Sequence, residues 1–316
     1  MTMTGMSVRI LDGQAIAAAI RAEAIPDVQA FTAAAGRPPG LGIVLVGSDP
    51  GSEVYVRNKV KAGGEAGLWV DLQRLPETAK LDEVLQLVER LNVSAVHDGI
   101  LVQSPLPSAM GKGAAQRVFD SINPDKDVDG FHPVNVGKLV QGRAVLKPCT
   151  PTGIIEILDR SGIQIGGRHA VVIGRSEIVG KPMAMLLLQR DATVTICHSK
   201  TPDLPAVART ADILVAAIGR PGFVTADFVK PGATVVDVGT TPVSDRAVVE
   251  RLFGVDSPRR AAYEKRGSIV VGDVHPGVAS VAGALTPVPG GVGPLTIALL
   301  LKNTITAARA RRDAHL

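Results

Sequence analysis

Short apolar runs alternate with mixed polar segments along the first 150 residues. The runs Leu41–Val46 and Gly99–Val102 contain no charged residue and end at turn or polar residues, which is typical of buried strands. Helical patterns surround these runs, at Gly13–Ala35, Glu53–Ala66 and Leu81–Leu91. Strands that alternate with helices predict a parallel sheet with crossover helices.

The same alternation resumes at His169. Four further apolar runs predict strands, at Ala170–Ile173, Thr193–Cys197, Ile213–Ala217 and Thr234–Val238. Helices fit between them, and Ile178–Gln189 has the clearest helical pattern. This second half therefore has the pattern of a Rossmann-type unit. A last helix is expected over Leu295–Ala310.

Two irregular segments, Asn123–Pro133 and Lys147–Pro151, follow these elements, and we place the domain boundary at the second of them. We therefore predict an α/β protein with two α/β domains. The first comprises residues 1–149 and is completed by the C-terminal helix at about 294–316, and the second comprises residues 150–293.

The composition narrows the class of protein. Of 316 residues, 46% are hydrophobic and only 3% are aromatic, so Ala, Val, Ile and Leu must build the core, as in sheets covered by helices. A disordered chain is excluded. The formal net charge of +4 is mild, and few aromatic rings are available to stack on bases, so a nucleic-acid partner is not expected.

The two cysteines, Cys149 and Cys197, are too few for a disulfide framework or a metal-ligand cluster. No apolar stretch is long enough to span a membrane, and no signal-peptide pattern is present. We expect a cytoplasmic protein without a membrane segment or a metal.

A candidate cofactor turn follows the strand that ends at Ile173. Gly174 and Gly180 flank a turn that leads into a helix, where a dinucleotide fold binds the pyrophosphate. Ser176 stands where the standard pattern has glycine, so the position of the turn carries the prediction. A tight turn without a ligand is the alternative.

The next strand ends near Cys197 and is followed by His198, Ser199 and Lys200. An NAD site usually has a carboxylate there, about 20 residues after the turn, to hold the ribose hydroxyl. The absence of a carboxylate, together with Arg175 in the turn, favours the 2′-phosphate of NADP. The alternative is that these are ordinary surface residues.

Candidate substrate residues lie in the first half. Tyr55 and Lys59 are four residues apart and share one helix face, where a ring could stack on a flat substrate and an amine could transfer protons. Such a pair by itself is more often a solvated helix face. Gln103 ends a buried strand, where ligands enter open α/β sheets.

Two loops are also candidates. Asp127 and Asp129 lie beside Gly130 in one loop and suggest ligand recognition, but no further acid or histidine completes a metal site. The loop Thr286–Pro294 is rich in Gly and Pro, and could lie flat against a ligand or merely connect two elements.

Taken together, these residues resemble the bifunctional methylenetetrahydrofolate dehydrogenase/methenyltetrahydrofolate cyclohydrolase family. Seven stretches match in family order and extend over nearly the whole chain: Tyr55–Lys61, Gly99–Pro107, Pro124–Pro133, Pro148–Pro151, Gly174–Pro182, His198–Thr201 and Thr286–Pro294. The resemblance implies NADP-dependent oxidation of 5,10-methylenetetrahydrofolate to the methenyl cation, and hydrolysis of that cation to 10-formyltetrahydrofolate. It also implies a folate cleft between the domains and a homodimer.

The resemblance also implies roles for particular residues. Lys59 would be the central catalytic residue, oriented by Gln103, while Asp129 would hold the pterin and Tyr55 would stack on the aminobenzoate ring. Further substrate contacts would come from Val102, Pro105, Pro289, Gly290 and Gly293. NADP would be held by Gly174, Arg175, Ser176, Ser199 and Thr240.

Three features depart from the family pattern. Thr240-Thr241-Pro242 and His275-Pro276 replace the usual residues at two positions, and Ser244–Arg266 is longer than usual. We interpret this longer segment as a surface excursion. The alternatives left open are a monofunctional or NAD-preferring dehydrogenase, and a non-catalytic folate or dinucleotide sensor.

Overall fold

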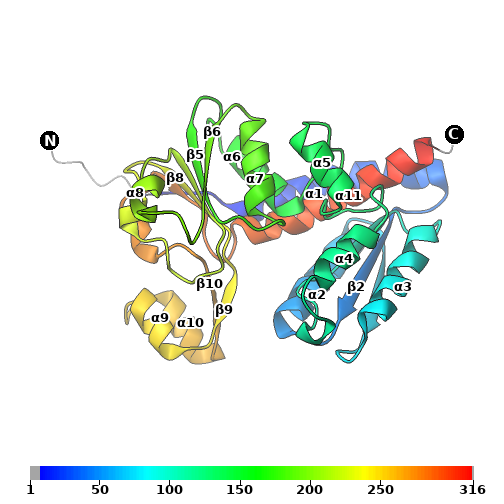
Figure 1. Cartoon of the computed structure of the whole chain (residues 1–316), viewed down its shortest axis with the longest axis horizontal. Helices are drawn as coiled ribbons and strands as arrows, with labels where there is room; N and C mark the ends of the chain where they lie inside the picture. The colour runs from blue at the N-terminus through cyan, green and yellow to red at the C-terminus, as the bar shows by residue number, and fades with distance from the viewer. Residues whose placement is uncertain (1–7, 315–316) are drawn as a thin grey trace. The chain divides into compact units, whose positions relative to one another are not determined.

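The computed structural model describes residues 8–314 (Figure 1). The chain separates into two compact units. The first unit comprises Ala17–Cys149 and Thr296–Leu316, and the second comprises the chain up to Ile16 and Thr150–Leu295. Because helices α1 (Gly13–Ala35) and α11 (Val292–Asp313) run across this division, both contribute residues to both units.

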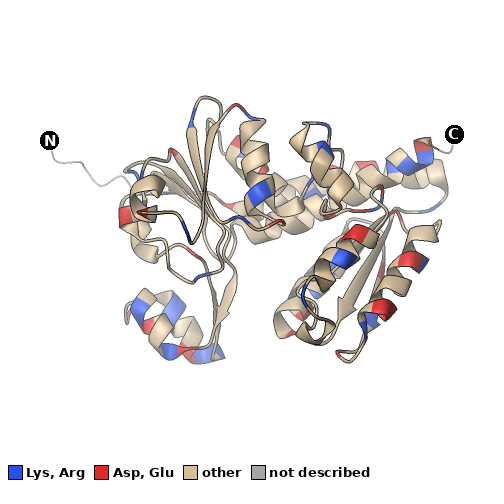
Figure 2. Cartoon of the chain, in the orientation of Figure 1, with Lys and Arg blue, Asp and Glu red and all other residues tan. Residues whose placement is uncertain are grey.

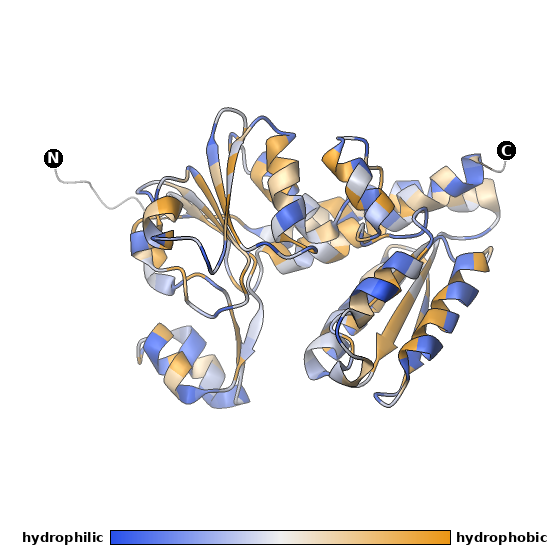
Figure 3. Ribbon diagram, viewed as in Figure 1, coloured by the Kyte–Doolittle hydropathy of each residue, from blue (hydrophilic) through white to orange (hydrophobic). Residues whose placement is uncertain are grey.

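The first unit contains a three-stranded parallel sheet in the order β3-β2-β4. Its strands are β2 (Gly40–Val46), β3 (Trp69–Leu75) and β4 (Gly99–Val102). Its shorter helices are α2 (Pro50–Glu65), α3 (Leu81–Val93), η1 (Ser108–Met110), α4 (Ala114–Ser121) and α5 (Pro133–Val140). Every residue of β2 is buried, and Figure 3 shows this strand as continuously hydrophobic.

Helix α2 begins at a cap, and helix α3 is held by its apolar face. The Asp49 carboxylate accepts a hydrogen bond from the Ser52 amide at 2.8 Å, and Pro50 occupies the first turn of α2. In α3, Val84, Leu87, Val88 and Leu91 are buried on one helix face against the sheet. Each such side chain contributes about 2 kcal/mol through burial.

The second unit contains a six-stranded sheet in the order β1-β11-β8-β7-β5-β6, with parallel pairing throughout. Its strands are β1 (Arg9–Ile10), β5 (His169–Ile173), β6 (Thr193–Cys197), β7 (Ile213–Ala216), β8 (Thr234–Asp237) and β11 (Ala284–Leu285). Its helices are α6 (Cys149–Arg160), α7 (Gly180–Leu188), α8 (Leu204–Ala208), η2 (Ala226–Phe228) and η3 (Pro276–Ser280). β5 pairs with β6 on one side and with β7 on the other, which creates the switch point where such sheets bind ligands.

The segment 244–266 forms a small excursion from this unit. It carries α9 (Arg246–Leu252) and α10 (Pro258–Arg266) between the antiparallel strands β9 (Thr241–Val243) and β10 (Ile269–Val271). Its helices are densely charged (Figure 2), and its apolar side chains form a cluster of their own with those of β9 and β10. The structure therefore agrees with the predicted surface excursion.

The structure differs from the sequence-based expectations in two places. Arg9 and Ile10, which the prediction included in the first domain, pair with Ala284 and Leu285 of the second unit. A two-residue strand has no hydrophobic period by which the sequence could reveal its partner. The strand β3 was also missed, since it lies at the sheet edge, is only partly buried and includes charged residues.

Candidate active site

Helix α2 and strand β4 bring Lys59 and Gln103 together. Lys59 is only 7% exposed although it is a lysine, and its Nζ donates a hydrogen bond to Gln103 Oε1 at 2.9 Å. Gln103 Nε2 donates to the carbonyl oxygen of Ser104 at 2.7 Å, which orients the amide so that its oxygen faces the amine. The backbone N–H of Gln103 donates to the carbonyl oxygen of Val44, and this bond holds Gln103 at the end of β4.

The surroundings of Lys59 favour its neutral form. Burial lowers the pKa of Lys59, and the nearby charge of Asp129 opposes this shift only partly. An amine with a lowered pKa can accept a proton near neutral pH, where an exposed lysine could not.

Asp129 lies in the loop that follows α4 and is partly buried. Burial raises the pKa of Asp129 to about 6, while the charge of Lys59 lowers it and that of Asp127 raises it. The Asp127 carboxylate is occupied with the loop itself, because it accepts hydrogen bonds from the amides of Gly130 and His132 and from the Asn135 side chain. The two carboxylates therefore differ, since within residues 8–314 the Asp129 carboxylate accepts no hydrogen bond from its own loop.

Asn303 of α11 fixes the backbone beside Asp129, and the sequence analysis missed it. Its Nδ2 donates to Val128 O and to Lys147 O, both at 2.8 Å, and lies 3.5 Å from Cys149 Sγ. No local motif could have indicated these contacts, because Asn303 is far from its partners in the sequence.

The thiol of Cys149 is part of this packing. It is 2% exposed and donates to Val128 O at 3.2 Å. Burial raises the pKa of Cys149 well above its ordinary range, so the thiol stays protonated and is a poor nucleophile.

The other substrate candidates of the first unit occupy different environments. Tyr55 lies one turn before Lys59 on α2 and is partly exposed. Pro105 is exposed and follows Ser104 in a cis peptide bond. Val102 is 2% exposed and packs in the core, so only its backbone is available to a ligand.

The cofactor turn of the second unit joins β5 to α7. Gly174 has a φ of +129°, and a Cβ there would lie 2.2 Å from Ala217 O; a Cβ at Gly180 would lie 2.3 Å from Gly174 O. Ser176 Oγ accepts hydrogen bonds from the Val179 and Gly180 amides, both at 3.2 Å. The serine thus caps the helix where the standard pattern has glycine, and the turn keeps the close packing that a pyrophosphate site needs.

Candidate residues for the rest of the cofactor lie at the same edge of the sheet. Arg175 follows β5, Ser199 and Lys200 follow β6, and Thr240 follows β8; all four are exposed. The carboxyl ends of parallel strands share one edge, so the fold brings these residues to the switch point. No carboxylate directly follows β6, where it would repel a 2′-phosphate, and the residues fit NADP.

Two buried aspartates that sequence reasoning missed hold the neighbouring loops. Asp237, at the end of β8, accepts hydrogen bonds from the amides of Gly239, Asp273 and Val274, and burial raises the pKa of Asp237 to about 7. Asp273 in turn accepts from three successive amides after β7, those of Ile218, Gly219 and Arg220. The carboxylates therefore shape the loops and are not exposed for catalysis.

The Gly/Pro-rich loop is anchored to the same strand, because Thr286 Oγ1 accepts from the Asp237 amide at 2.8 Å. Pro289 is exposed and follows a cis peptide bond, and Gly290 has a φ of +104°, which a side chain would strain. Gly293 lies in the first turn of α11, where an added Cβ would meet open space. The loop thus presents backbone and a proline ring.

The structure explains two departures from the family pattern. Thr241 and Pro242 belong to β9, where they pair with β10. His275 Nδ1 accepts from the Gly277 amide at 3.0 Å and caps η3, with Pro276 in its first position. Both replacements therefore have a local structural role.

The described residues contain no group of three or more His, Cys, Asp or Glu side chains that could hold a metal ion. Nor does any helix within residues 8–314 combine the length and hydrophobicity needed to cross a bilayer. A Rossmann-type sheet with a phosphate turn, joined to a unit that holds a buried lysine, defines an NAD(P)-binding α/β enzyme.

Comparison with known proteins identifies the family. Residues 148–312 match the tetrahydrofolate dehydrogenase/cyclohydrolase NAD(P)-binding domain, and residues 11–129 match the catalytic domain of the same family. The bifunctional protein FolD of Koribacter versatilis is 57% identical over 307 residues, which are 97% of this chain and 99% of that protein. FolD of Moorella thermoacetica is 49% identical over 305 residues, 96% of this chain and all of that protein.

Solved structures of the same family are also similar to this chain. FolD methylenetetrahydrofolate dehydrogenase/cyclohydrolase of Campylobacter jejuni has a TM-score of 0.84 at 39% identity, covering 96% of this chain and 100% of that chain. The Trypanosoma brucei enzyme, complexed with NADP and an inhibitor, has a TM-score of 0.85 at 39% identity, covering 97% and 99%. The chain belongs to the tetrahydrofolate dehydrogenase/cyclohydrolase family. The expected family, the two-unit α/β class and the nicotinamide cofactor class are confirmed.

Proposed function

We propose that this protein oxidises 5,10-methylenetetrahydrofolate with NADP and then hydrolyses the methenyl product to 10-formyltetrahydrofolate, as a bifunctional enzyme of one-carbon metabolism. The observation that carries this proposal is the buried Lys59 amine, with its lowered pKa and its hydrogen bond to Gln103. The first unit would carry the folate chemistry and the second would bind the cofactor.

Lys59 handles protons in the second reaction. Water adds to the methenyl carbon and releases one proton, which leaves a hydroxyl on that carbon. The hydroxyl proton then passes to the ring nitrogen as the carbon–nitrogen bond opens, and the carbon remains as the formyl group. The methenyl substrate is a cation, so it opposes a neighbouring ammonium and favours the neutral amine that burial has already prepared. The neutral amine accepts the proton released from water, and Gln103 Oε1 keeps it in place.

Folate binding uses the residues around Lys59. Asp129, the carboxylate without a loop hydrogen bond, would hold the amino and N–H edge of the pterin, and Tyr55 would stack on the aminobenzoate ring. Backbone and ring contacts would come from Val102, Pro105, Pro289, Gly290 and Gly293. Because hydride transfer needs little besides closeness and orientation of two flat rings, binding residues suffice for the first reaction.

NADP would be held at the switch point of the second unit. Bound NADP supplies the hydride acceptor. The glycine-lined turn at Gly174, with Ser176 capping α7, offers helix amides to the pyrophosphate, and Arg175 and Ser199 would contact the 2′-phosphate. Thr240, which follows β8, would lie toward the nicotinamide.

The decisive experiment compares wild type, Lys59→Ala and Lys61→Ala in two assays. Lys61 is the matched control, since it lies on the same helix but is largely exposed and paired with Glu65. One assay follows NADP reduction with methylenetetrahydrofolate, and the other follows decay of methenyltetrahydrofolate above its spontaneous rate. We expect wild type and Lys61→Ala to catalyse both reactions, and Lys59→Ala to lose the hydrolysis.

Other outcomes would select the alternatives. Reduction without hydrolysis by wild type would make the protein a monofunctional dehydrogenase, and faster reduction of NAD would reverse the cofactor preference. Binding of folate and NADP with neither reaction would indicate a sensor.

A homodimer formed through the second unit is also part of the proposal. Leu188 at the end of α7 and Ile196 on the edge strand β6 are large apolar side chains that stay 55% and 39% exposed. Apolar side chains at an open sheet edge support pairing with a second copy. Sedimentation of wild type and of Ile196→Lys would show whether the protein forms a dimer through this edge.

We also propose that the protein is cytoplasmic, which cell fractionation would test.

A further inference from the structure

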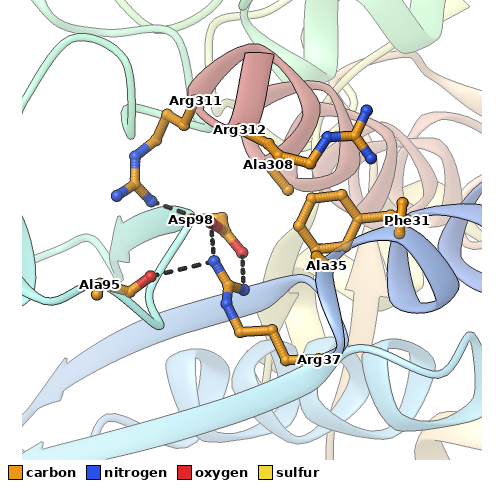
Figure 4. A pocket seen from close by; sticks show the side chains of 9 residues that line it. Phe31, Ala35, Arg37, Ala95, Asp98, Ala308, Arg311 and Arg312 are labelled. Atoms are coloured by element: carbon orange, nitrogen blue, oxygen red, sulfur yellow. Dashed lines mark hydrogen bonds and ion pairs between the residues drawn. The ribbon is translucent and has the colours of Figure 1, made fainter. Parts of the chain in front are cut away.

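The first unit has a pocket of about 590 Å³ where the end of α1, the turn before β4 and the last turns of α11 meet (Figure 4). Asp98 lines the pocket and immediately precedes β4, whereas Gln103 immediately follows this strand. The two therefore lie at opposite ends of β4, roughly 16 Å apart at the usual rise per residue. The pocket is separate from the Lys59 site and has a volume typical of small-molecule sites.

Cations outnumber carboxylates around this pocket. The side chain of Asp98 is 1% exposed and is bound by both terminal nitrogens of Arg37, at 2.7 and 2.9 Å, and by Arg311 at 3.0 Å. Burial lowers the pKa of the nearby Lys126 ammonium to about 8. The positive charges of Arg311 and Arg37 contribute to the same shift. Three arginines, Arg37, Arg311 and Arg312, thus line the pocket together with a single carboxylate, that of Asp98.

Arg311 is held in place without being saturated, whereas all three donors of the Lys126 ammonium are occupied. Lys126 Nζ donates to three carbonyl oxygens at the end of α3, those of Leu91, Asn92 and Ser94. Arg311 uses Nη1 for Asp98 and for His97 O, which leaves its other nitrogens without a protein partner within residues 8–314. The guanidinium fork is therefore oriented and still has donors to offer.

The floor of the pocket is apolar. Figure 4 shows the Phe31 ring between Ala35 and Ala308, with Arg37 and Arg311 converging on Asp98 beside it. The guanidinium carbons of Arg37 and Arg312 lie 5.5 and 5.8 Å from the Phe31 ring centroid. Cationic groups beside an apolar floor match a ligand that is itself part anion and part hydrocarbon.

We propose that this pocket binds a small organic oxyanion, whose carboxylate or phosphate group pairs with Arg311 and Arg312 while its apolar part covers the floor near Phe31. Guanidinium groups bind both oxyanions through two parallel hydrogen bonds, so the chemistry is shared by both ligand types. The excess of cations over Asp98 supplies the charge, and the open volume supplies the space.

Binding would be measured by calorimetry at low salt with phenyl phosphate and benzoate as probes. Saturating NADP would keep the probes from the cofactor site. Ala34→Glu places a carboxylate at the pocket's rim on an exposed position, and Arg312→Gln removes a cation that donates to its neighbour Asp313. The matched controls are Ala33→Glu, an exposed neighbour outside the pocket, and Arg309→Gln, which pairs with Asp27 instead.

We expect saturable binding of at least one probe, weakened about tenfold or more by Ala34→Glu and Arg312→Gln and unchanged in both controls, as the loss of a charge-assisted hydrogen bond predicts. Stronger binding of phenyl phosphate would identify a phosphate ester as the ligand class, and stronger binding of benzoate a carboxylate. No saturable binding of either probe, or equal affinity in wild type and both pocket variants, would overturn the proposal.

Discussion

Asn303 Nδ2 donates a hydrogen bond to the carbonyl oxygen of Val128 at 2.8 Å, and so ties the last helix to the residue before Asp129. The contact joins segments that are widely separated in the chain. It places Asn303 among the residues that position the site, although the geometry gives it no direct contact with the reacting groups.

Replacing Asn303 with Ala should loosen the backbone that carries Asp129. We expect kcat/KM for methylenetetrahydrofolate to fall about tenfold, since small misplacements at an active site are costly. KM for NADP should not change. Thr306→Ala is the control, because Thr306 lies on the same helix and bonds only within it. Equal losses for folate and NADP would indicate general destabilisation and contradict a positioning role.

Gln103→Glu should move the pH profile of the hydrolysis. The reaction requires neutral Lys59, so its rate should increase with pH through the lowered pKa of Lys59. A carboxylate in place of the Gln103 amide stabilises the ammonium, and the rise should therefore shift to higher pH. The comparison is Gln116→Glu, a change at a partly exposed position of α4. An unshifted profile in Gln103→Glu would mean that Lys59 is not the titrating group.

Asp129→Asn should stabilise the protein without ligands while abolishing folate binding. Burial raises the pKa of Asp129 to about 6, against about 3.9 when unfolded, so the folded state binds more protons between these values. The free energy of unfolding therefore falls as pH rises from about 4 to 6, and the cost is fully present above pH 6.

Asparagine stays neutral at every pH, so the Asp129→Asn variant avoids the cost of burying a charged carboxylate. We expect it to be more stable than wild type by about 1–2 kcal/mol at pH 8, with the difference vanishing near pH 4. Denaturation in urea at pH 4, 6 and 8 measures this, with Asp125→Asn as the exposed control in the same loop. A variant less stable than wild type at pH 8 would argue against the burial cost.

Ser199→Asp should reverse the cofactor preference. A carboxylate after β6 repels a 2′-phosphate and can accept hydrogen bonds from a ribose hydroxyl, so KM for NADP should rise about tenfold or more while NAD becomes the better substrate. Arg175→Gln should raise KM for NADP in the same direction. Arg168→Gln is its control, because Arg168 precedes β5 whereas Arg175 follows it. Unchanged NADP kinetics in both site variants would place the 2′-phosphate elsewhere.

Much of the fold was readable from the sequence because its signals are local. The helix Gly13–Ala35 and the strands β5 and β6 were predicted to within a residue or so, since their apolar periods and flanking turns are contained in each segment. Short or partly buried edge strands, such as β1 and β3, carry too weak a pattern for that.

The sequence by itself determined the two-part α/β organisation, and it singled out the turn at Gly174 and the candidates Tyr55, Lys59, Gln103 and Asp129. Those features depend on residue type and spacing along the chain. Only the tertiary structure decided that Lys59 is buried against Gln103, that Asn303 holds the Asp129 loop, and that Arg37 and Arg311 meet at Asp98. Burial and hydrogen bonding arise between segments that are distant in sequence, and these contacts set the pKa values and the charge balance on which the chemistry depends.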